Sequence, residues 1–392
     1  MAVLARFLGD IAFAEEAVQE AFLVALAKWP GTGIPPSPAG WLITTARNHA
    51  LDRLRREATR PDREHAAQLL NDPGPVEEHE VQDDHLRLVF TCCHPALAPE
   101  AQVALTLRLI GGLGTEEIAH AFLQKPAAVA QRIWRAKSKI RDARIPYRVP
   151  DKDELPGRLA AVLAVIYLVF NEGYSSSRGE EVLRTDLCDE AIRLGRLLVT
   201  LMPEEPEASG LLALMLLSDA RRDARVRDGE LVPLPEQDRS RWDAARIAEG
   251  HGLVRKCLAR NLPGPYQLQA AIHAVHCDAP TAGGTDWRQI LLLYDQLLAI
   301  APSAVIALNR AVAVAEVHGP VHALKLIDGL DLRNYHYHHA VRADLLRRAG
   351  RLPDALLAYR AALDQCTNPG ERSFLARQCQ ALAGDVASGA KP

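Results

Sequence analysis

Residues 115–140, with the sequence TEEIAHAFLQKPAAVAQRIWRAKSKI, hold the most specific local pattern in the chain. Thr115 is placed to cap a helix whose first turn carries two acids, where the helix dipole favours them. Pro126 suits the first position of a second helix, along which apolar residues recur with helical spacing. These apolar residues are Val129, Ile133, Ala136 and Ile140. The segment therefore predicts two short helices joined by a tight turn.

The free face of the predicted second helix is basic. Arg132 and Arg135 lie about one turn apart on it, a spacing that suits guanine edges or phosphates in a DNA major groove. Two short helices with a basic second helix are typical of a helix-turn-helix. An ordinary solvated helix carries the same apolar stripe, so the pattern alone leaves both interpretations open.

Charge is segregated on either side of this segment, although the whole chain has a net charge of only −3. Residues 61–100 contain nine acids and two bases, a net charge of −7. Residues 103–148 contain nine bases and three acids, a net charge of +6. A basic stretch inside a nearly neutral chain indicates a polyanionic partner.

The composition of the 392 residues narrows the class of protein. It is 48% hydrophobic and 24% charged, as in soluble folded chains of two or three domains. Aromatic residues make up only 5%, and abundant Ala and Leu favour an all-α fold. The longest apolar run, 159–170, is shorter than the roughly 20 residues of a membrane span. Seven scattered cysteines suit a reducing compartment, so we expect a cytoplasmic protein without membrane contact.

Proline-rich and acidic stretches divide the chain into blocks. Residues 1–60 are predicted to be helical around a loop at 30–38 that contains four prolines. Residues 61–84 are predicted to be an acidic linker, and 85–145 a second helical block. A further linker is expected at 146–157, followed by a larger helical domain over 158–392.

The first block carries its own candidate site on a predicted helix that follows the proline loop. Leu42, Ala46, Ala50 and Leu54 form its apolar stripe, and the residues off that stripe include Arg47, Asn48, Arg53, Arg55 and Arg56. Trp41 at the start of this helix, with arginines further along, suits stacking on an unpaired base and contact with phosphates. Trp41 taken alone is better explained as a core residue.

An acidic and polar face precedes this helix. It consists of Glu15, Glu16, Gln19 and Glu20, opposite the apolar residues Ala17, Ala21 and Leu26. Solvated surface explains this face equally well.

The end of the chain contains a repeat. Ala311, Ala323 and Ile327 recur 32 residues later as Ala343, Ala355 and Tyr359. Small residues let paired helices approach each other, and the large residue fills the gap between them. This spacing resembles tetratricopeptide repeats, and a generic helical bundle is the alternative.

Several Cys and His clusters invite a metal-site interpretation, namely Cys92-Cys93-His94, His273 with His276 and Cys277, and His336 with His338 and His339. Neighbouring cysteines point about 100° apart on a helix, and the chain has no paired CxxC motif. We therefore expect Cys92 and Cys93 to be small core residues. We also expect no metal, no cofactor and no enzymatic activity, since no phosphate loop or nucleophile motif is present.

Taken together, these motifs resemble a known family. Residues 14–22, AEEAVQEAF, followed by Trp41-Leu42, Arg47-Asn48 and LDRLRR at 51–56, resemble region 2 of bacterial sigma-70-family factors. Gly112-Leu113, Glu117-Ile118-Ala119 and Arg135-Ala136-Lys137 resemble region 4. The two regions with a long helical extension resemble extracytoplasmic-function (ECF) sigma factors. TCCHP at 91–95, FNEGY at 170–174 and QDR at 237–239 resemble the subgroup with a C-terminal tetratricopeptide-like (TPR-like) domain.

This resemblance implies a function for each block: region 2 over 1–60, a region 4 helix-turn-helix over 85–145, and a regulatory TPR-like domain. The implied partners are core RNA polymerase, promoter DNA and a protein or peptide regulator of the C-terminal domain. The implied −35 contacts are Ala127, Ala128, Gln131, Arg132 and Arg135. The implied −10 contacts are Trp41, Arg47, Asn48, Arg55 and Arg56. The implied polymerase contacts are Glu15, Glu16, Gln19 and Glu20.

The resemblance leaves two alternatives and two local expectations. The alternatives are a free-standing helix-turn-helix regulator with a TPR-like sensor, and a TPR-like scaffold with decayed DNA binding. The first helix of region 2 is expected to be short before Gly9, which leaves Val18, Phe22 and Leu26 with less cover. Lys125-Pro126 stands where the family more often has a small capping hydroxyl.

Overall fold

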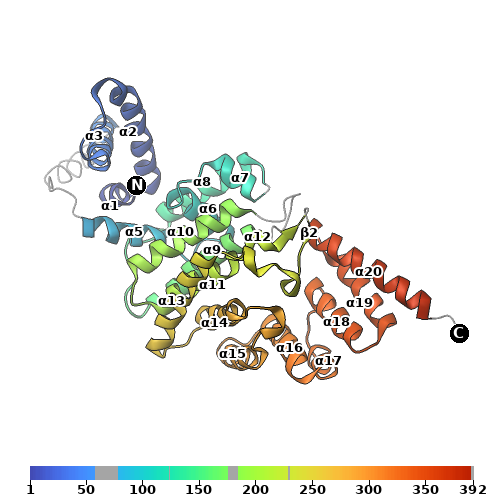
Figure 1. Cartoon of the computed structure of the whole chain (residues 1–392). Helices are drawn as coiled ribbons and strands as arrows, with labels where there is room; N and C mark the ends of the chain where they lie inside the picture. Colours follow the sequence, from blue (N-terminus) through green and yellow to red (C-terminus); the bar gives the residue numbers. More distant parts are fainter. Residues whose placement is uncertain (58–77, 123, 175–183, 228–229, 390–392) are drawn as a thin grey trace. The chain divides into compact units, whose positions relative to one another are not determined.

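The computed structural model of the chain describes residues 1–57, 78–122, 124–174, 184–227 and 230–389 (Figure 1). Almost all of the regular structure in these ranges is α-helical, which confirms the all-α prediction. The chain divides into two compact units, residues 1–166 and residues 167–392. Most of the predicted acidic linker lies outside the described residues, and its last part, from Glu78, is already helical.

The first unit contains seven complete helices in its described ranges. They are α1 (Ala2–Leu8), α2 (Ile11–Thr32), α3 (Pro38–Glu57), α5 (Glu78–Cys92), α6 (Pro99–Leu109), α7 (Thr115–Ala121) and α8 (Pro126–Asp142). Gly9 ends α1 in a left-handed conformation with φ of 67°, which glycine adopts without steric cost. Asp10 then caps α2, where its Oδ1 accepts hydrogen bonds from the amides of Ala12 at 2.7 Å and Phe13 at 3.1 Å.

The proline loop is shorter than predicted. Pro30 lies inside the last turn of α2, which ends at Thr32, and Pro38 is the first residue of α3. A proline in a last turn removes a single backbone hydrogen bond, and proline fits the first position of a helix. The loop between α2 and α3 is therefore confined to residues 33–37.

One hydrophobic cluster of the first unit contains buried residues from both its early helices, α2 and α3, and its later helices, α6 and α8. Ala14 and Ala17 of α2 and Ala46 of α3 belong to the same cluster of buried residues as Leu105 of α6 and Ala136 of α8. Small side chains on α2 allow the neighbouring backbones to approach closely. The predicted regions 2 and 4 are thus packed against each other in this unit.

The boundary between the two units falls within α9 (Leu155–Tyr174). The predicted linker at 146–157 therefore belongs to the first unit, where the Tyr147 hydroxyl donates to the carbonyl oxygens of Ala2 at 2.9 Å and Asp84 at 3.0 Å. By length and composition α9 is the one described helix that meets the criteria for a membrane span. Several of its apolar residues, including Val162 and Val169, are buried, and 39% of its apolar window is buried inside the protein.

The second unit is also helical. Its helices are α10 (Thr185–Leu201), α11 (Pro206–Asp219), α12 (Arg222–Arg225), α13 (Ala244–Arg260), α14 (Pro265–Asp278), α15 (Trp287–Ile300), α16 (Ala304–His318), α17 (Pro320–Ile327), α18 (His336–Arg348), α19 (Leu352–Gln365) and α20 (Pro369–Gly389). Short strands β1 (Val226–Arg227) and β2 (Glu230–Leu231) pair antiparallel. The 3₁₀ turns are η1 (Leu234–Glu236), η2 (Arg239–Arg241) and η3 (Ala282–Gly284).

The predicted repeat positions lie in one core. Ala311, Ala323 and Ile327 are fully buried, and so are Ala343, Ala355 and almost all of Tyr359. Consecutive helices from α16 to α20 pack as neighbours, as expected for small residues at the contact points. The packing expected from the repeat pattern is present, while the TPR-like classification stays a prediction.

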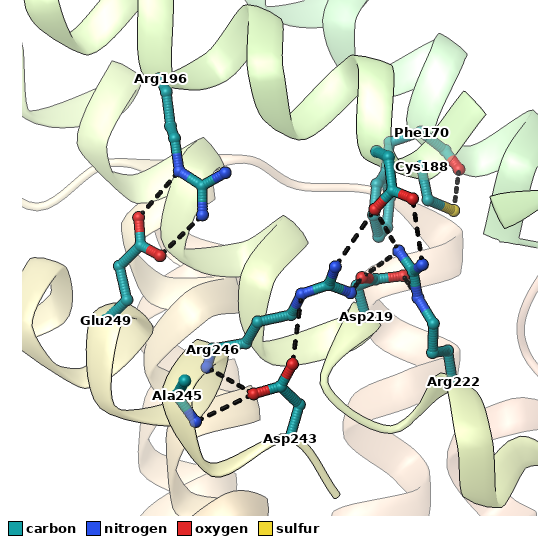
Figure 2. A network of polar contacts seen from close by, with 10 residues as sticks. Phe170, Cys188, Arg196, Asp219, Arg222, Asp243, Ala245, Arg246 and Glu249 are labelled. Carbon is teal, nitrogen blue, oxygen red and sulfur yellow. Dashed lines mark hydrogen bonds and ion pairs between the residues drawn. The ribbon is translucent and has the colours of Figure 1, made fainter. Parts of the chain in front are cut away.

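A buried ionic network ties α11, α12 and α13 together (Figure 2). The Asp219 side chain is only 1% exposed and accepts from Arg222 at 2.8 Å and from Arg246. Asp243 caps α13 through the amides of Ala245 and Arg246. Burying these charges is tolerable because each guanidinium has a carboxylate partner.

Candidate nucleic-acid and polymerase interface

The two helices predicted from residues 115–140 are present as α7 and α8. The α7 cap differs by one residue, because Thr115 is already helical and the Gly114 amide donates to the Glu117 carboxylate. Lys125 precedes α8 without a side-chain cap, and Pro126 takes the first position. The predicted apolar stripe of α8 is confirmed, since its buried residues are Val129, Ile133, Ala136 and Ile140.

Most of the predicted −35 contacts lie on the solvent face of α8. Ala127, Ala128, Gln131 and Arg135 are exposed. Arg132 is partly buried, and its guanidinium donates to Gln124 Oε1 at 2.5 Å. Arg135 therefore offers the freer guanidinium for a ligand. Trp134 on the same helix is 66% exposed, and sequence reasoning missed it although it stood outside the apolar stripe.

The predicted −10 residues on α3 have more mixed surroundings. Trp41 is partly buried and meets Trp29 edge-on, with ring centroids 5.5 Å apart. The Arg47 guanidinium lies over the Phe7 ring at 4.4 Å from the centroid, while Asn48 is exposed. The side chains of Arg55 and Arg56 lie outside the described residues.

The stripe predicted for α3 is present where it is described. Ala46 and Ala50 are 1% exposed, and Leu42 packs against the same core. The side chain of Leu54 is not among those described. Trp41 is thus anchored at one end of α3 by another tryptophan while part of its ring stays accessible.

The predicted polymerase contacts on α2 divide into two groups. Glu16, Gln19 and Glu20 are exposed, and the exposed Glu16 carboxylate accepts from Arg53 at 2.5 Å. Glu15 is different, because its carboxylate is only 14% exposed and pairs with Arg108 of α6 at 2.8 Å and with Lys137 of α8. Glu15 therefore pairs with the helices of the predicted region 4 within the same unit.

The prediction that Leu26 lies on the buried face of α2 is wrong. Ala17 and Ala21 are buried as expected, but Leu26 is 72% exposed, and Phe22 and Leu23 are also exposed. The buried residues of α2 are Ile11 near its start and then only alanines, Ala14, Ala17, Ala21 and Ala25. Large apolar side chains thus follow directly after the acids on the exposed side of α2, as is typical of a protein-docking surface.

The thiols considered as metal ligands near region 4 are buried. Cys92 and Cys93 have at most 1% of their surface exposed, and burial raises the pKa of Cys93 to about 11. The Cys93 thiol lies 3.5 Å from the Thr106 hydroxyl. Metals bind the thiolate, so this environment favours the predicted role of both cysteines as small core residues.

The histidine clusters behave differently from each other. His273 is partly buried beside Arg221, and loss of solvent together with that cation holds its pKa well below the ordinary value. His336, Cys366 and Glu371 bring their ligand atoms within 4.8 Å of one another. Their groups satisfy one another, since His336 Nε2 lies 2.9 Å from a Glu371 oxygen, and burial raises the pKa of the Cys366 thiol to about 11.

Comparison with known proteins gives two family matches and several relatives. Residues 1–60 match Sigma-70 region 2, and residues 158–258 match a family of unknown function, DUF6596. The chain is 44% identical over 398 residues to "Uncharacterized protein R00370" of Rhizobium meliloti (strain 1021), covering 99% of this chain and 94% of that protein. It is 31% identical over 147 residues to "Probable ECF RNA polymerase sigma factor SigI" of Mycobacterium tuberculosis (strains CDC 1551 / Oshkosh and ATCC 25618 / H37Rv), covering 36% of this chain and 50% of SigI.

Proposed function

The chain belongs to the same family as protein R00370 of Rhizobium meliloti over nearly its whole length, and we propose that it is an RNA polymerase sigma factor. The match to sigma-70 region 2 and the partial similarity to SigI support a sigma-factor-like role. The observation that carries the proposal is the exposed cationic face of α8 in the same compact unit as a region 2 match. As a sigma factor, the protein would act in the cytoplasm without covalent chemistry.

In this proposal α8 reads the −35 element. Arg135, Gln131 and the small Ala127 and Ala128 form an exposed face that fits a major groove. Trp41 and Asn48 on α3 serve the −10 element, where base stacking of ~1.4 kcal/mol per step has to be overcome. Stacking on an aromatic ring and contact with phosphates offset that cost.

The packing of regions 2 and 4 bears on when DNA is bound. A compact unit of 166 residues is about 40 Å across. Elements named −10 and −35 lie about 25 base pairs apart, or roughly 85 Å at ~3.4 Å per pair. Both cannot be reached from one compact unit, so we propose that binding to polymerase separates the two regions and breaks the contacts of Glu15 with Arg108 and Lys137.

The exposed side of α2 is the proposed polymerase-docking surface. It combines the acids Glu16 and Glu20 with the exposed apolar residues Phe22, Leu23 and Leu26. An apolar patch rimmed by polar groups is typical of a protein interface. This surface is already exposed while the two regions are packed together.

The second unit is the proposed regulator of the first. Because both are in one chain, their effective concentration is on the order of mM, and even weak contacts would be populated. A truncated chain that ends after Ile166 keeps every residue of the first unit. We expect such a chain to change promoter output several-fold in either direction, as measured by run-off transcription, while circular dichroism shows that it stays folded.

The decisive experiment is run-off transcription with core polymerase on promoters recovered by genomic binding. We expect specific initiation by the full chain, and its loss when Leu23→Glu and Leu26→Glu are combined. Leu292→Glu is the matched control, since Leu292 is 62% exposed on α15 in the second unit. Duplex binding without any association with polymerase would instead indicate a free-standing regulator, and neither activity would indicate a scaffold.

A further inference from the structure

A cavity of ≈ 310 Å³ lies wholly within the second unit. Two groups of polar residues line it: Tyr174, Arg221 and Arg225, which contact one another, and His336 and Glu371, which pair with each other. The remaining wall is mostly apolar and includes Leu231, Leu234 and Phe374. This volume is at the lower end of the range for small-molecule sites.

Among the described residues, the two arginines of the cavity have no carboxylate partner, whereas Arg222 and Arg246 of the same unit pair with Asp219. Arg221 is 6% exposed, and its guanidinium contacts the Tyr174 hydroxyl at 3.4 Å and His273 Nδ1 at 3.2 Å. Arg225 lies over the Tyr174 ring, 3.9 Å from its centroid. In the described part of the chain neither forms an ion pair, and the Nε atoms of both have no hydrogen-bond partner.

The groups around Arg221 and Arg225 do not neutralise them. His273 is held neutral, because burial and the neighbouring cation lower its pKa. Although burial raises the pKa of Tyr174, the two arginines together bring it below the ordinary value. A lowered tyrosine pKa indicates that the surroundings of Arg221 and Arg225 favour negative charge.

The other group of lining residues has its charge matched, since the Glu371 carboxylate accepts from Tyr337 and contacts His336 at 2.9 Å. Gln237 also lines the cavity, and its Oε1 is buried without a partner among the described residues. A buried cation without a counter-ion is costly, and here the buried Arg221 and the partly buried Arg225 line a mostly apolar cavity of the size of a small ligand.

We propose that this cavity binds a small organic anion, with its carboxylate or phosphate group on Arg221 and Arg225 and its apolar body against the Leu231 wall. Charge-assisted hydrogen bonds from arginine suit either head group. The ligand is a small molecule because the volume is too small for a folded partner segment. The proposal does not depend on the sigma-factor assignment, since binding is measured without polymerase or DNA.

The test is calorimetric titration of the full chain with four probes at millimolar concentration. Phenyl phosphate and phenylacetate carry both an anionic head and an apolar body, inorganic phosphate carries only the head, and phenol only the body. We expect saturable binding of one or both complete probes and weaker binding of each fragment. The tighter of the two complete probes identifies the head group, and phenol binding as tightly as both would overturn the proposal.

Variants separate this site from nonspecific anion binding. Arg225→Gln is expected to weaken the better probe by about tenfold or more, and Phe374→Ala is expected to weaken it while leaving inorganic phosphate unchanged. Arg255→Gln is the control, because Arg255 is exposed on α13 outside the cavity. Both Arg225→Gln and Phe374→Ala keep Arg221 intact, and thermal unfolding verifies their fold. Equal affinity of wild type and Arg225→Gln, or no saturable binding by either anionic probe, would refute the proposal.

Discussion

Two groups of arginines in this protein lie in opposite environments. Arg222 and Arg246 of the second unit converge on Asp219, which is almost fully buried, and also contact Asp189. Arg135 of α8 is exposed and has no acidic partner among the described residues. Arg132 lies between these extremes, because it donates to the neutral Gln124.

The pairing of each guanidinium distinguishes structural arginines from ligand-binding ones. A buried guanidinium with two carboxylates has its hydrogen-bonding capacity used by the fold. An exposed guanidinium on a rigid helix keeps that capacity for a phosphate or a base edge. The variants Asp219→Ala, Glu15→Gln, Arg135→Ala and Asp189→Asn test this distinction.

Removal of the shared acid of the paired group should cause the largest loss. Asp219→Ala leaves Arg222 and Arg246 with less compensation in a buried site, so we expect the free energy of unfolding to fall by about 3–5 kcal/mol. Urea unfolding followed by circular dichroism measures it. The control is Asp295→Ala, which removes an exposed partner of Arg310 and should change stability by about 1 kcal/mol or less. Equal effects of the two variants would show that the buried network is not structural.

A variant of Glu15 tests whether its ion pairs stabilise the packing of the predicted regions 2 and 4 against each other. Glu15→Gln removes the charge that pairs with Arg108 and Lys137, an interaction of about 1.5–3 kcal/mol for a charged hydrogen bond. Weakening the packing of the predicted regions 2 and 4 against each other should raise the affinity for core polymerase by about tenfold or more, measured by fluorescence anisotropy.

The matched control variant is Glu154→Gln, at an exposed glutamate of the first unit outside the proposed docking surface. Its ion pair with Arg148 is exposed and does not join the predicted regions 2 and 4, so we expect no change in polymerase affinity. If Glu15→Gln instead lowers the affinity for polymerase, Glu15 is a direct polymerase contact, as the family resemblance implies.

Arg135 is expected to affect the affinity for promoter DNA and not the free energy of unfolding. Arg135→Ala should weaken promoter binding by the polymerase complex by roughly 1–3 kcal/mol and relax specificity at one −35 position. Its free energy of unfolding should stay within about 0.5 kcal/mol of wild type. Arg288→Ala, at an exposed arginine of α15, is the control. A uniform loss on all sequences with a smaller salt dependence would assign Arg135 to a phosphate.

The elements with strong periodicity could be predicted from the sequence. The buried stripe of α8 matched at all four positions, and the small-residue positions of the repeat are buried as expected. These patterns are local, because one face of a helix is determined by residues three and four apart. Four of the five predicted site residues on α8 are exposed for the same reason, and Arg132 is partly buried.

Features that depend on contacts between distant residues could not be predicted. Glu15 and Lys137 are 122 residues apart, and nothing in either local pattern indicates that they pair. Leu26 fits a helical apolar pattern but is exposed, because α2 packs through alanines. The cavity of the second unit likewise joins Arg221 to Phe374, which only the fold brings together.

Asp189 gives the smallest expected effect and tests the outer edge of the paired group. Although partial burial raises the pKa of Asp189, hydrogen bonds and charge from Arg222 and Arg246 bring it below the ordinary value. Its contribution to stability is therefore complete above the unfolded-state pKa of about 3.9 and is lost as the pH falls through the lower folded-state pKa. Because Asp189 is about half exposed, Asp189→Asn should cost at most about 1 kcal/mol at pH 7. Urea unfolding of both proteins at pH 7 and at about pH 3 should show this difference shrinking in acid, and a difference that grows in acid would contradict the assigned pairing.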